Sequence, residues 1–473
     1  MLRYLRWASA LVLAVAALLA LAGWLDGQAK AGIAPDTYPP PTPVSGECQE
    51  WGRGEAVSGT LEMTPRLYLP LVASFYAFTQ PVTPTLPVTE LRAVWVSRYD
   101  WTRYGQSPTP ADIQHVVDTA AAAGFNAIFF QVRGAGDAYY TPGLEPWASR
   151  LTGSLGPTLG QYPGWDPLAE IVSHAHASGV QVHAWFNVYP AWLPPPSSTY
   201  GALVPGRDIS PPQALNRLTY SSDGGYGLGY TWRVYDRPVV TGYMPIQWGQ
   251  YLWASPAVPQ VQEHVAAVVA DVAARYAIDG VHLDNVRYPG AAYSLDPFTL
   301  DAYARDPLSL TLTITAWRPD FQRAQVSQLV LRIFTQTHAA HPTMTVSAAV
   351  WPSYQRGYES YYQDSQGWML SQMIDAVAPM LYSSDVITDL AAWTAAAAGF
   401  QAHAGGGLVL PGIGVKYAGA CLPFEAIAAR IEAARQLGTA GQAVFSLSEL
   451  EGCGYVDELC QGPYAAPVLP AGP

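Results

Sequence analysis

The stretch Asp279-Gly-Val-His-Leu-Asp-Asn-Val-Arg-Tyr-Pro289 has the pattern of a short strand with polar residues on one face. His282 and Asp284 alternate with apolar neighbours, so both side chains should point to the same side of the strand. A strand buried in a parallel sheet is normally a near-continuous apolar run. Polar residues near its carboxyl end therefore indicate a functional site at that edge of a sheet.

Seven further apolar, β-branched runs surround this one, and they alternate with Ala-rich segments of helical period. The eight expected strands are 92–97, 127–133, 181–187, 280–286, 344–350, 376–383, 408–415 and 442–447. The expected helices are 110–123, 166–178, 259–276, 321–340, 367–374, 387–403 and 423–437. Eight strands in βα order predict an α/β fold, a (β/α)8 TIM barrel.

Two connections are much longer than the others and should stand over the top of this barrel. Residues 189–255 follow the third strand, and residues 288–317 follow the fourth. The first insert is rich in Gly, Pro and aromatic residues, among them Tyr226, Tyr230, Trp232, Tyr235 and Trp248. Long loops at this end of a barrel commonly carry function, so we expect an extended cleft for a chain-like substrate.

Polar residues also interrupt the second and third strands at period two. Gln131 and Arg133 end the second strand, and His183, Trp185 and Asn187 lie along the third. Burying a guanidinium, a carboxylate and two imidazoles together costs free energy unless they pair or bind a ligand. Each alone could be a structural group, but their convergence predicts a site at the mouth of the barrel.

Six motifs, taken in order, resemble the bacterial glycosyl-hydrolase-like 10 family of secreted TIM-barrel proteins over residues 90 to 450. They are Glu90-Leu-Arg-Ala-Val-Trp-Val, Phe129-Phe-Gln-Val-Arg-Gly-Ala-Gly-Asp-Ala-Tyr-Tyr, Leu144-Glu-Pro-Trp with Leu151-Thr-Gly, Val182-His-Ala-Trp-Phe-Asn, the stretch from Asp279 to Pro289, and Ala378-Pro-Met-Leu-Tyr. The resemblance implies a (β/α)8 barrel, export and action on glycans, with members implicated in cleaving peptidoglycan strands. Many members carry a second Asp directly after the fourth-strand Asp, where this chain has Asn285.

Cleavage of a glycosidic bond ordinarily needs two carboxyl groups that flank the bond. We expect Asp284 to be one, kept ionised by Arg287 or Arg133. Glu145, between apolar and aromatic neighbours, is the favoured partner, because such surroundings raise the pKa of a carboxyl into the range of a general acid. The alternatives for the partner are Asp137, Asp385 and Glu449. Asp166 precedes Pro167 at the start of an expected helix and is assigned to an N-cap.

Aromatic rings near strand ends are the expected platforms for the flat C–H faces of sugars. Trp95, Trp147, Trp185, Trp351 and Tyr382 occupy such positions, although core packing is an alternative role for each. The expected substrate-binding residues are Asp137, Arg133, Gln131, His183, Trp185, Asn187, His282, Arg287, Tyr382, Trp95 and Trp351.

Two rival interpretations remain open. A metal-dependent hydrolase would use His183, His282 and an aspartate (Asp284 or Asp137) as zinc ligands, but no HxH or HExxH spacing supports such a site. We therefore expect neither a metal nor a cofactor. A glycan-binding or wall-anchoring protein without activity is favoured by the absence of the second Asp and by a long spacer before the barrel.

The N-terminus has the features of an export signal. Arg3 and Arg6 precede an apolar run, residues 7–25, and Ala29-Lys30-Ala31 offers a cleavage site. The run is also just long enough to remain as a membrane anchor. We divide the chain into a signal or anchor (1–31), a Pro/Thr-rich linker (32–89), the barrel (90–460) and a tail (461–473). Either form places the barrel outside the cytoplasm, secreted or anchored.

The four cysteines, Cys48, Cys421, Cys453 and Cys460, would then lie in an oxidising compartment and allow two disulfides in three connectivities. We favour Cys421 with Cys453, because they follow the neighbouring seventh and eighth strands. The formal net charge is −12, and the sequence has no basic cluster. We therefore do not expect nucleic acid to be a partner.

Overall fold

The structure is a computed structural model, and it describes residues 89–193, 251–291, 293–382, 386–466 and 468. A parallel sheet of nine strands lies at the centre, in the order β10-β13-β1-β2-β3-β6-β7-β8-β9. The strands are β1 (Leu91–Val96), β2 (Ala127–Arg133), β3 (Gln181–Asn187), β6 (Gly280–Asp284), β7 (Thr345–Val350), β8 (Ala376–Pro379), β9 (Leu408–Val409), β10 (Gly412–Gly414) and β13 (Gly441–Phe445).

The expected seventh strand, 408–415, is divided into two short strands. β9 pairs with β8 at one end of the strand order, and β10 pairs with β13 at the other. Only Leu410 and Pro411 separate them, and proline has no amide hydrogen with which to continue a ladder. The two edges of the sheet are therefore consecutive pieces of one segment, and the fold is α/β and TIM-barrel-like.

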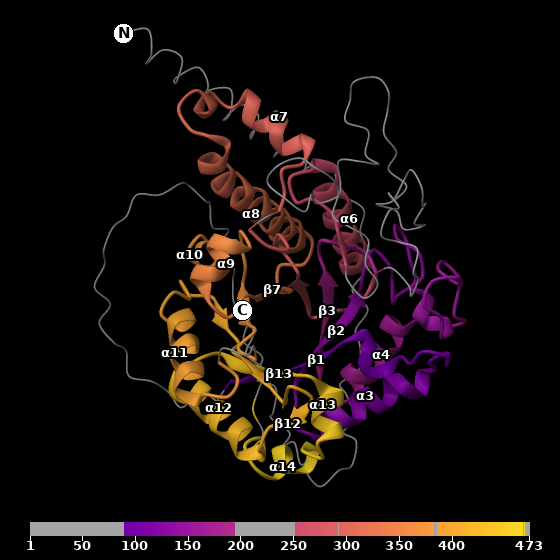
Figure 1. The fold of residues 1–473 in the computed structure, drawn as a ribbon. Helices are drawn as coiled ribbons and strands as arrows, with labels where there is room; N and C mark the ends of the chain where they lie inside the picture. Colours follow the sequence, from indigo (N-terminus) through magenta and orange to yellow (C-terminus); the bar gives the residue numbers. More distant parts are fainter. Residues whose placement is uncertain (1–88, 194–250, 292, 383–385, 467, 469–473) are drawn as a thin grey trace, which may run out of the picture. The chain divides into compact units, whose positions relative to one another are not determined.

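Helices surround the strands (Figure 1) and occupy the seven places where the sequence predicted them. They are α3 (Pro110–Ala122), α4 (Pro167–Ala177), α6 (Pro259–Arg275), α8 (Ile314–Ala340), α10 (Ser365–Leu370), α11 (Leu390–Gln401) and α12 (Phe424–Gln436). Asp166 caps α4 by accepting the amides of Leu168 and Ala169, as predicted. α8 begins seven residues before the expected position and is 27 residues long.

The buried residues form two layers, one inside the barrel and one between the strands and the helices. Along β2, Phe129 belongs to the inner cluster, whereas Ile128 and Phe130 belong to the outer one. The inner cluster combines three large aromatic residues with smaller aliphatic ones. Its members are Leu91, Ala93, Trp95, Ala127, Phe129, Trp185, Ala376, Ala378, Leu410 and Ala443. This period-two division fixes which strand residues can reach the mouth of the barrel.

Several short elements decorate the strand ends without having been expected. They are α2 (Arg98–Trp101), β4 (Pro190–Trp192), β5 (Leu252–Trp253), α7 (Pro297–Arg305), α9 (Tyr354–Ser360), β11 (Lys416–Tyr417), β12 (Ala420–Cys421), α13 (Leu447–Gly452) and α14 (Val456–Gln461). β4 and β5 pair antiparallel, so the two described ends of the first insert lie together. The middle of that insert, with the five aromatic residues named above, lies outside the described residues.

Two aspartates that stand directly before strands tie the sheet to the helices at the end opposite the mouth. Asp279, before β6, accepts the amide of Val182 and bonds His176 at the end of α4, both at 2.8 Å. Asp375, before β8, bonds His338 at the end of α8 in the same way, at 2.8 Å. We call these two arrangements the His–Asp staples.

Cys421 and Cys453 form the expected disulfide, with their Cα atoms 5.9 Å apart. The packed part of the chain also runs past the expected boundary at 460, because buried Tyr464 contacts Phe125 and Arg92.

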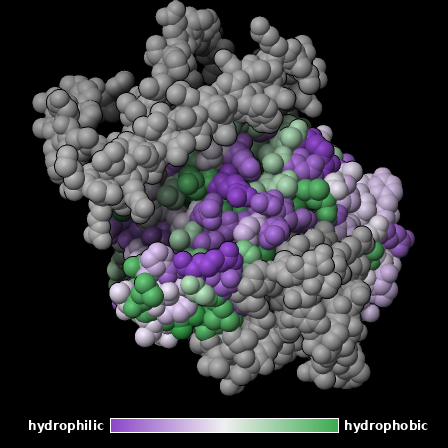
Figure 2. Space-filling model, turned by 90° about the horizontal axis from the view of Figure 1, so that it is seen from above, coloured by the Kyte–Doolittle hydropathy of each residue, from purple (hydrophilic) through white to green (hydrophobic). Residues whose placement is uncertain are grey.

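No helix in the described ranges is both long enough and apolar enough to cross a membrane. The expected signal or anchor (1–31) and the linker up to residue 88 lie outside those ranges. On the face seen in Figure 2, hydrophilic residues gather near the centre with hydrophobic residues beside them.

Candidate active site

Asp284 is the last residue of β6, and it lies at the barrel mouth, by which we mean the carboxyl ends of the strands and the residues directly after them. Its side chain is 15% exposed, and the side chain of Arg287 is 12% exposed. The neighbouring strand β3 places Asn187 beside it in register, and the amide of Val188 donates to the Asp284 carbonyl at 2.8 Å. Asp284 is therefore a largely enclosed carboxyl that keeps some access to the mouth.

Asn285 holds the Asp284 carboxyl and links it to Arg287. Its backbone amide donates to Oδ1 of Asp284 at 2.5 Å, and its side-chain amide donates to Oδ2 at 3.2 Å. Its own Oδ1 accepts from Arg287 Nη2 at 2.9 Å. Asn285 has a φ of 53°, a left-handed conformation that Asn tolerates better than most residues. The ionised side chain of an aspartate here could not donate to Oδ2 of Asp284, so asparagine gives the site a neutral clamp.

The protonation of Asp284 differs from the sequence expectation. Burial raises the pKa of Asp284, and Arg287, 3.5 Å away, only partly offsets this. We expected arginine to keep this carboxyl ionised. The net direction is the opposite, because the enclosed position outweighs the long ion pair, and a carboxyl of this kind suits a general acid.

Glu145 was expected to have a raised pKa, and that expectation is wrong. Its fully buried carboxylate receives two hydrogen bonds from Arg133, at 2.7 and 2.8 Å, and a third from His264 at 2.9 Å. Burial alone would raise the pKa of Glu145, but Arg133 and His264 lower it to about 2. In this state Glu145 is the anion of a buried ion pair and not a proton donor.

A β-bulge explains why Arg133 does not face the mouth as predicted. The register between β2 and β3 shifts between Gln131 and Arg133, so Gln131 pairs with Trp185 and Arg133 with Phe186. Trp185 belongs to the inner cluster and Phe186 to the outer one. The extra residue turns Arg133 to the outer side. There it donates to Glu145 and to backbone carbonyls at and after the end of β3, and it is completely buried.

His183 and His282 lie inside the barrel and not at the mouth, which corrects their expected role in binding substrate. Both are at most 2% exposed. His282 bonds Trp95 and Ser347 through its two ring nitrogens and stacks on Phe129 with the ring centres 4.1 Å apart. Burial lowers the pKa of His183 to about 4 and that of His282 well below its usual value, so both are neutral. The two imidazole rings therefore pack inside the barrel as neutral core residues.

Gln131 and Asn187 lie at or near the carboxyl ends of their strands, although each is only 2% exposed, and there they contact two residues that the sequence did not single out. Gln131 Oε1 accepts from Arg98 Nη1 at 2.8 Å. Arg98 Nη2 donates to the Tyr251 hydroxyl at 2.7 Å, and Asn187 Nδ2 donates to the same oxygen at 3.4 Å and to the Gly134 carbonyl at 3.0 Å. The position of Arg98 directly after β1 was the available signal, because residues there face the mouth of a barrel.

Asp137 is a second carboxyl in this part of the mouth. A Cβ added at Gly134 would lie 3.1 Å from Asp137 Oδ1 and 3.0 Å from Arg98 Cδ, so the two side chains flank this glycine. The Ala135 amide donates to Asp137 at 2.7 Å. Burial raises the pKa of Asp137, and Arg98 opposes the shift. Asp137 is thus a neighbour of Arg98, and Asp284 is the register partner of Asn187, so each carboxyl lies next to one member of the group formed by Arg98, Asn187 and Tyr251.

Other carboxyls complete the rim of the mouth. Glu449 in α13 is partly buried, which raises its pKa, and Lys416 opposes the shift. Asp100 in α2, which the sequence did not single out, accepts a hydrogen bond from Ser446 at 3.0 Å. Asp385, an expected alternative, lies outside the described residues.

Aromatic rings form the floor of the mouth. Tyr382 is partly buried and stacks on Phe445 with the ring centres 4.8 Å apart, and Trp95 packs edge-on against both from below. Trp95 is only 1% exposed, so it supports this floor and does not present a face. Trp185 is 6% exposed and donates to Asn187 at 3.1 Å. Trp147, also considered as a platform, is 7% exposed and belongs to the outer core.

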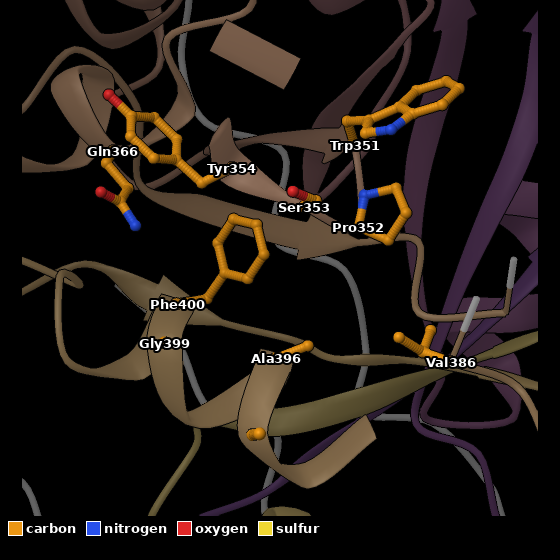
Figure 3. A pocket seen from close by; sticks show the side chains of 10 residues that line it. Trp351, Pro352, Ser353, Tyr354, Gln366, Val386, Ala396, Gly399 and Phe400 are labelled. Atoms are coloured by element: carbon orange, nitrogen blue, oxygen red, sulfur yellow. The ribbon is translucent and has the colours of Figure 1, made fainter. Parts of the chain in front are cut away.

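Trp351, which follows β7, stacks on Tyr361 with the ring centres 3.9 Å apart. The Cζ atom of the Arg287 guanidinium lies over the Trp351 ring, 5.5 Å from its centre. Trp351 also borders a cavity of about 280 Å³ between the segment after β7 and helix α11 (Figure 3). In that view Phe400 points into the space, and Tyr354 and Gln366 border its far side. This mainly apolar cavity adjoins the mouth through Trp351.

The described residues contain no group of three His, Cys, Asp or Glu side chains that could hold a metal ion. His282, which a zinc site would need, has both ring nitrogens engaged by Trp95 and Ser347. The residues near Asp284 therefore do not fit the donor set of a zinc centre.

A family model described as glycosyl hydrolase-like 10 matches residues 90–195 and 232–403. The chain is 28% identical over 320 residues to "Glycosyl hydrolase YngK" of Bacillus subtilis, an alignment that covers 62% of this chain and 54% of that protein. It is 26% identical over 336 residues to "Glycosyl hydrolase DigH" of Escherichia coli K12, which covers 64% of this chain and 67% of that one. The chain therefore spans between about half and two thirds of the length of these relatives.

Among solved structures, the glycoside hydrolase domain of PgaB (BpsB) from Bordetella bronchiseptica is similar to this chain with a TM-score of 0.51. The alignment covers 78% of this chain and 98% of that domain at 14% sequence identity. A likeness at this identity concerns the fold alone, and it agrees with a TIM-barrel-like glycoside hydrolase fold.

Proposed function

Because the chain belongs to the glycosyl hydrolase-like 10 family, we propose that it is an exported glycoside hydrolase that cleaves glycosidic bonds in a polysaccharide. The substrate that we favour is the glycan strand of peptidoglycan. The observation that carries the proposal is Asp284, a partly accessible carboxyl with a raised pKa at the end of β6, next to stacked aromatic rings. The disulfide Cys421–Cys453 supports an oxidising compartment and hence export.

In the proposed reaction Asp284 is the general acid that protonates the leaving-group oxygen. Its raised pKa keeps a proton available at a higher pH than for an ordinary aspartate. A second carboxyl must stabilise the oxocarbenium-like state or activate water from the other side of the sugar. Glu145 was our expected partner, but its buried ion pair argues against this role. We therefore assign the second role to Asp137, which borders the same polar group from the β2 side.

The aromatic rings would hold the sugar units on either side of the bond. Tyr382 on Phe445 offers a partly exposed ring on the floor, and Trp351 offers one beside Arg287. Apolar ring faces combined with a few fixed polar groups are what a sugar-binding cleft requires. Asn187, Gln131 and Arg287 supply such polar groups at this level of the barrel.

The test is product analysis after incubation of the full chain with a panel of purified polysaccharides that includes peptidoglycan strands freed of peptides. We expect new reducing ends from at least one polymer. Binding of a polymer without any product would favour the glycan-binding protein that the missing second Asp suggests.

The same incubation with EDTA tests the metal-dependent alternative. We expect cleavage to continue in EDTA, because the side chains near Asp284 do not form a set of zinc ligands. Complete loss of activity that a single added metal restores would support the metal-dependent hydrolase instead.

A further inference from the structure

Tyr251 is brought into the mouth by the way the first insert ends. It directly precedes β5, and β5 pairs antiparallel with β4, which begins three residues after the end of β3. The chain thus returns to the end of β3 after the long insert. Tyr251 is therefore part of the mouth although it lies 64 residues from Asn187 in the sequence.

The hydroxyl of Tyr251 is used only as an acceptor by the described residues. Arg98 Nη2 donates to it at 2.7 Å and Asn187 Nδ2 at 3.4 Å. A guanidinium cannot accept a hydrogen bond, and the amide nitrogen of Asn187 cannot either. The phenolic proton must therefore point away from both, and no acceptor for it is found among the described residues.

The phenol of Tyr251 lies near Asp284 in the mouth. Asn187, which holds the phenol, is the register partner of Asp284. Burial raises the pKa of Tyr251, and the nearby negative charge of Asp284 raises it further. The hydroxyl therefore stays protonated. The phenol thus combines an oxygen fixed by two donors with a proton for which the described residues offer no acceptor.

We propose that Tyr251 is a catalytic hydrogen-bond donor, whose hydroxyl contacts the sugar oxygen that develops charge when the bond next to Asp284 breaks. Arg98 and Asn187 are positioning residues that fix the direction of this donor. No proton is transferred by Tyr251, so the step adds no change to the balance of the reaction. The inference rests on the proposed function and adds a third group to the two carboxyls.

Tyr99 provides a matched control for the test. Its hydroxyl accepts from the same nitrogen, Arg98 Nη2, at 2.6 Å, but its side chain lies on the surface and is 50% exposed. Tyr251→Phe and Tyr99→Phe thus each remove one phenolic acceptor of Arg98. Only the first removes a hydroxyl proton from a phenol inside the mouth.

The experiment measures kcat and KM of the full chain and both variants on peptidoglycan strands freed of peptides, with thermal melts to verify folding. We expect Tyr251→Phe to lower kcat about 10- to 100-fold with a small change in KM, since one preorganised donor at a transition state has an effect of this order or larger. Tyr99→Phe should keep kcat within about threefold of the parent, because a surface phenol has no part in the reaction.

Two results would overturn the inference while leaving the enzyme in place. One is an unchanged kcat for Tyr251→Phe, and the other is an equal loss for both variants, which would show that Tyr251 only supports Arg98. If the parent chain releases no product from any glycan, the proposed function fails first, and this inference fails with it.

Discussion

At the scale of single residues, Asn285 shows how one amide shapes the chemistry of its neighbour. It donates to both oxygens of Asp284 and accepts from Arg287. The family pattern often has a second aspartate at this position, which would add a negative charge and remove one donor. The asparagine keeps Asp284 as a single titrating group, whose pKa is raised by burial.

The pH dependence of cleavage should report this group. A general acid works while protonated, so kcat/KM should fall as the pH rises through the pKa of Asp284, which lies above the usual aspartate value. Asn285→Asp should move this fall to higher pH, because a neighbouring negative charge disfavours ionisation and the pair titrates together. The measurement is a pH–rate profile for both proteins. A fall that moves to lower pH, or that does not move, would count against Asp284 as the acid.

Glu145 should matter for stability more than for chemistry. Glu145→Gln leaves the guanidinium of Arg133 buried without its countercharge, so the free energy of unfolding should drop by about 3 kcal/mol or more. Denaturant unfolding measures this loss, and the kcat of the folded variant should fall by less than about tenfold, since Glu145 is not the proton donor. Intact stability together with a 10³-fold loss of kcat would instead make Glu145 the catalytic partner that its sequence surroundings suggested.

At the scale of elements, the His–Asp staples join helix ends to strand starts at the end opposite the mouth. The hydrogen bond from His176 to Asp279 raises the pKa of His176. A raised pKa in the folded state stabilises the fold fully below the pKa of the unfolded histidine, about 6.5, and this contribution is lost as the pH rises through the folded pKa. α4 should therefore be held more firmly in mild acid than in mild base.

His176→Gln tests this staple. The loss of unfolding free energy caused by the substitution should be larger at pH 5.5 than at pH 8.5 in denaturant titrations. His115→Gln is the control, because the ion pair of His115 with Glu451 is exposed on both sides, at 62% and 47%, and such pairs contribute little. An equal loss at both pH values, or a larger loss at pH 8.5, would show that the staple is not a charged pair.

The elements also show what the sequence could predict. β2 and β3 have the expected bounds, because the apolar residues in each give a clear strand pattern although polar residues interrupt it. The run 408–415 is as apolar, yet Pro411 breaks it, and its role at both edges of the sheet follows from closure rather than from hydrophobicity. α7 was missed because it is a short helix inside a segment expected to be a loop.

The site was predicted less completely because its contacts depend on three-dimensional partners. Period-two alternation placed Arg133 at the mouth, but a bulge after Gln131 turns it outward. The pKa of Glu145 was judged from its neighbours in sequence, whereas His264, 119 residues away, and Arg133 decide it. Asp284, Asn187 and Gln131 lie at or near the carboxyl ends of their strands, as their sequence positions indicated, and their roles in binding or cleavage remain predictions.

At the scale of the whole molecule, the acidic residues of the mouth lie at or after the carboxyl ends of several different strands. Asp284 ends β6, whereas Asp137, Glu449 and Asp100 follow β2, β13 and β1, respectively. Substrate must therefore meet groups that only the closed arrangement of strands brings together. The matched part of the family model covers most of this rim, and the export signal and linker remain proposals from the sequence.

We propose above all that Asp284 is the general acid in the cleavage of a glycan. The most direct test compares the parent chain with Asp284→Asn and measures how fast each releases reducing ends from peptide-free peptidoglycan strands. The substitution keeps the shape of the side chain but removes its acid, so kcat should fall by a factor of about 10³ or more while the thermal melt stays close to that of the parent. An Asp284→Asn protein that is folded and releases reducing ends at the parental rate would contradict the account.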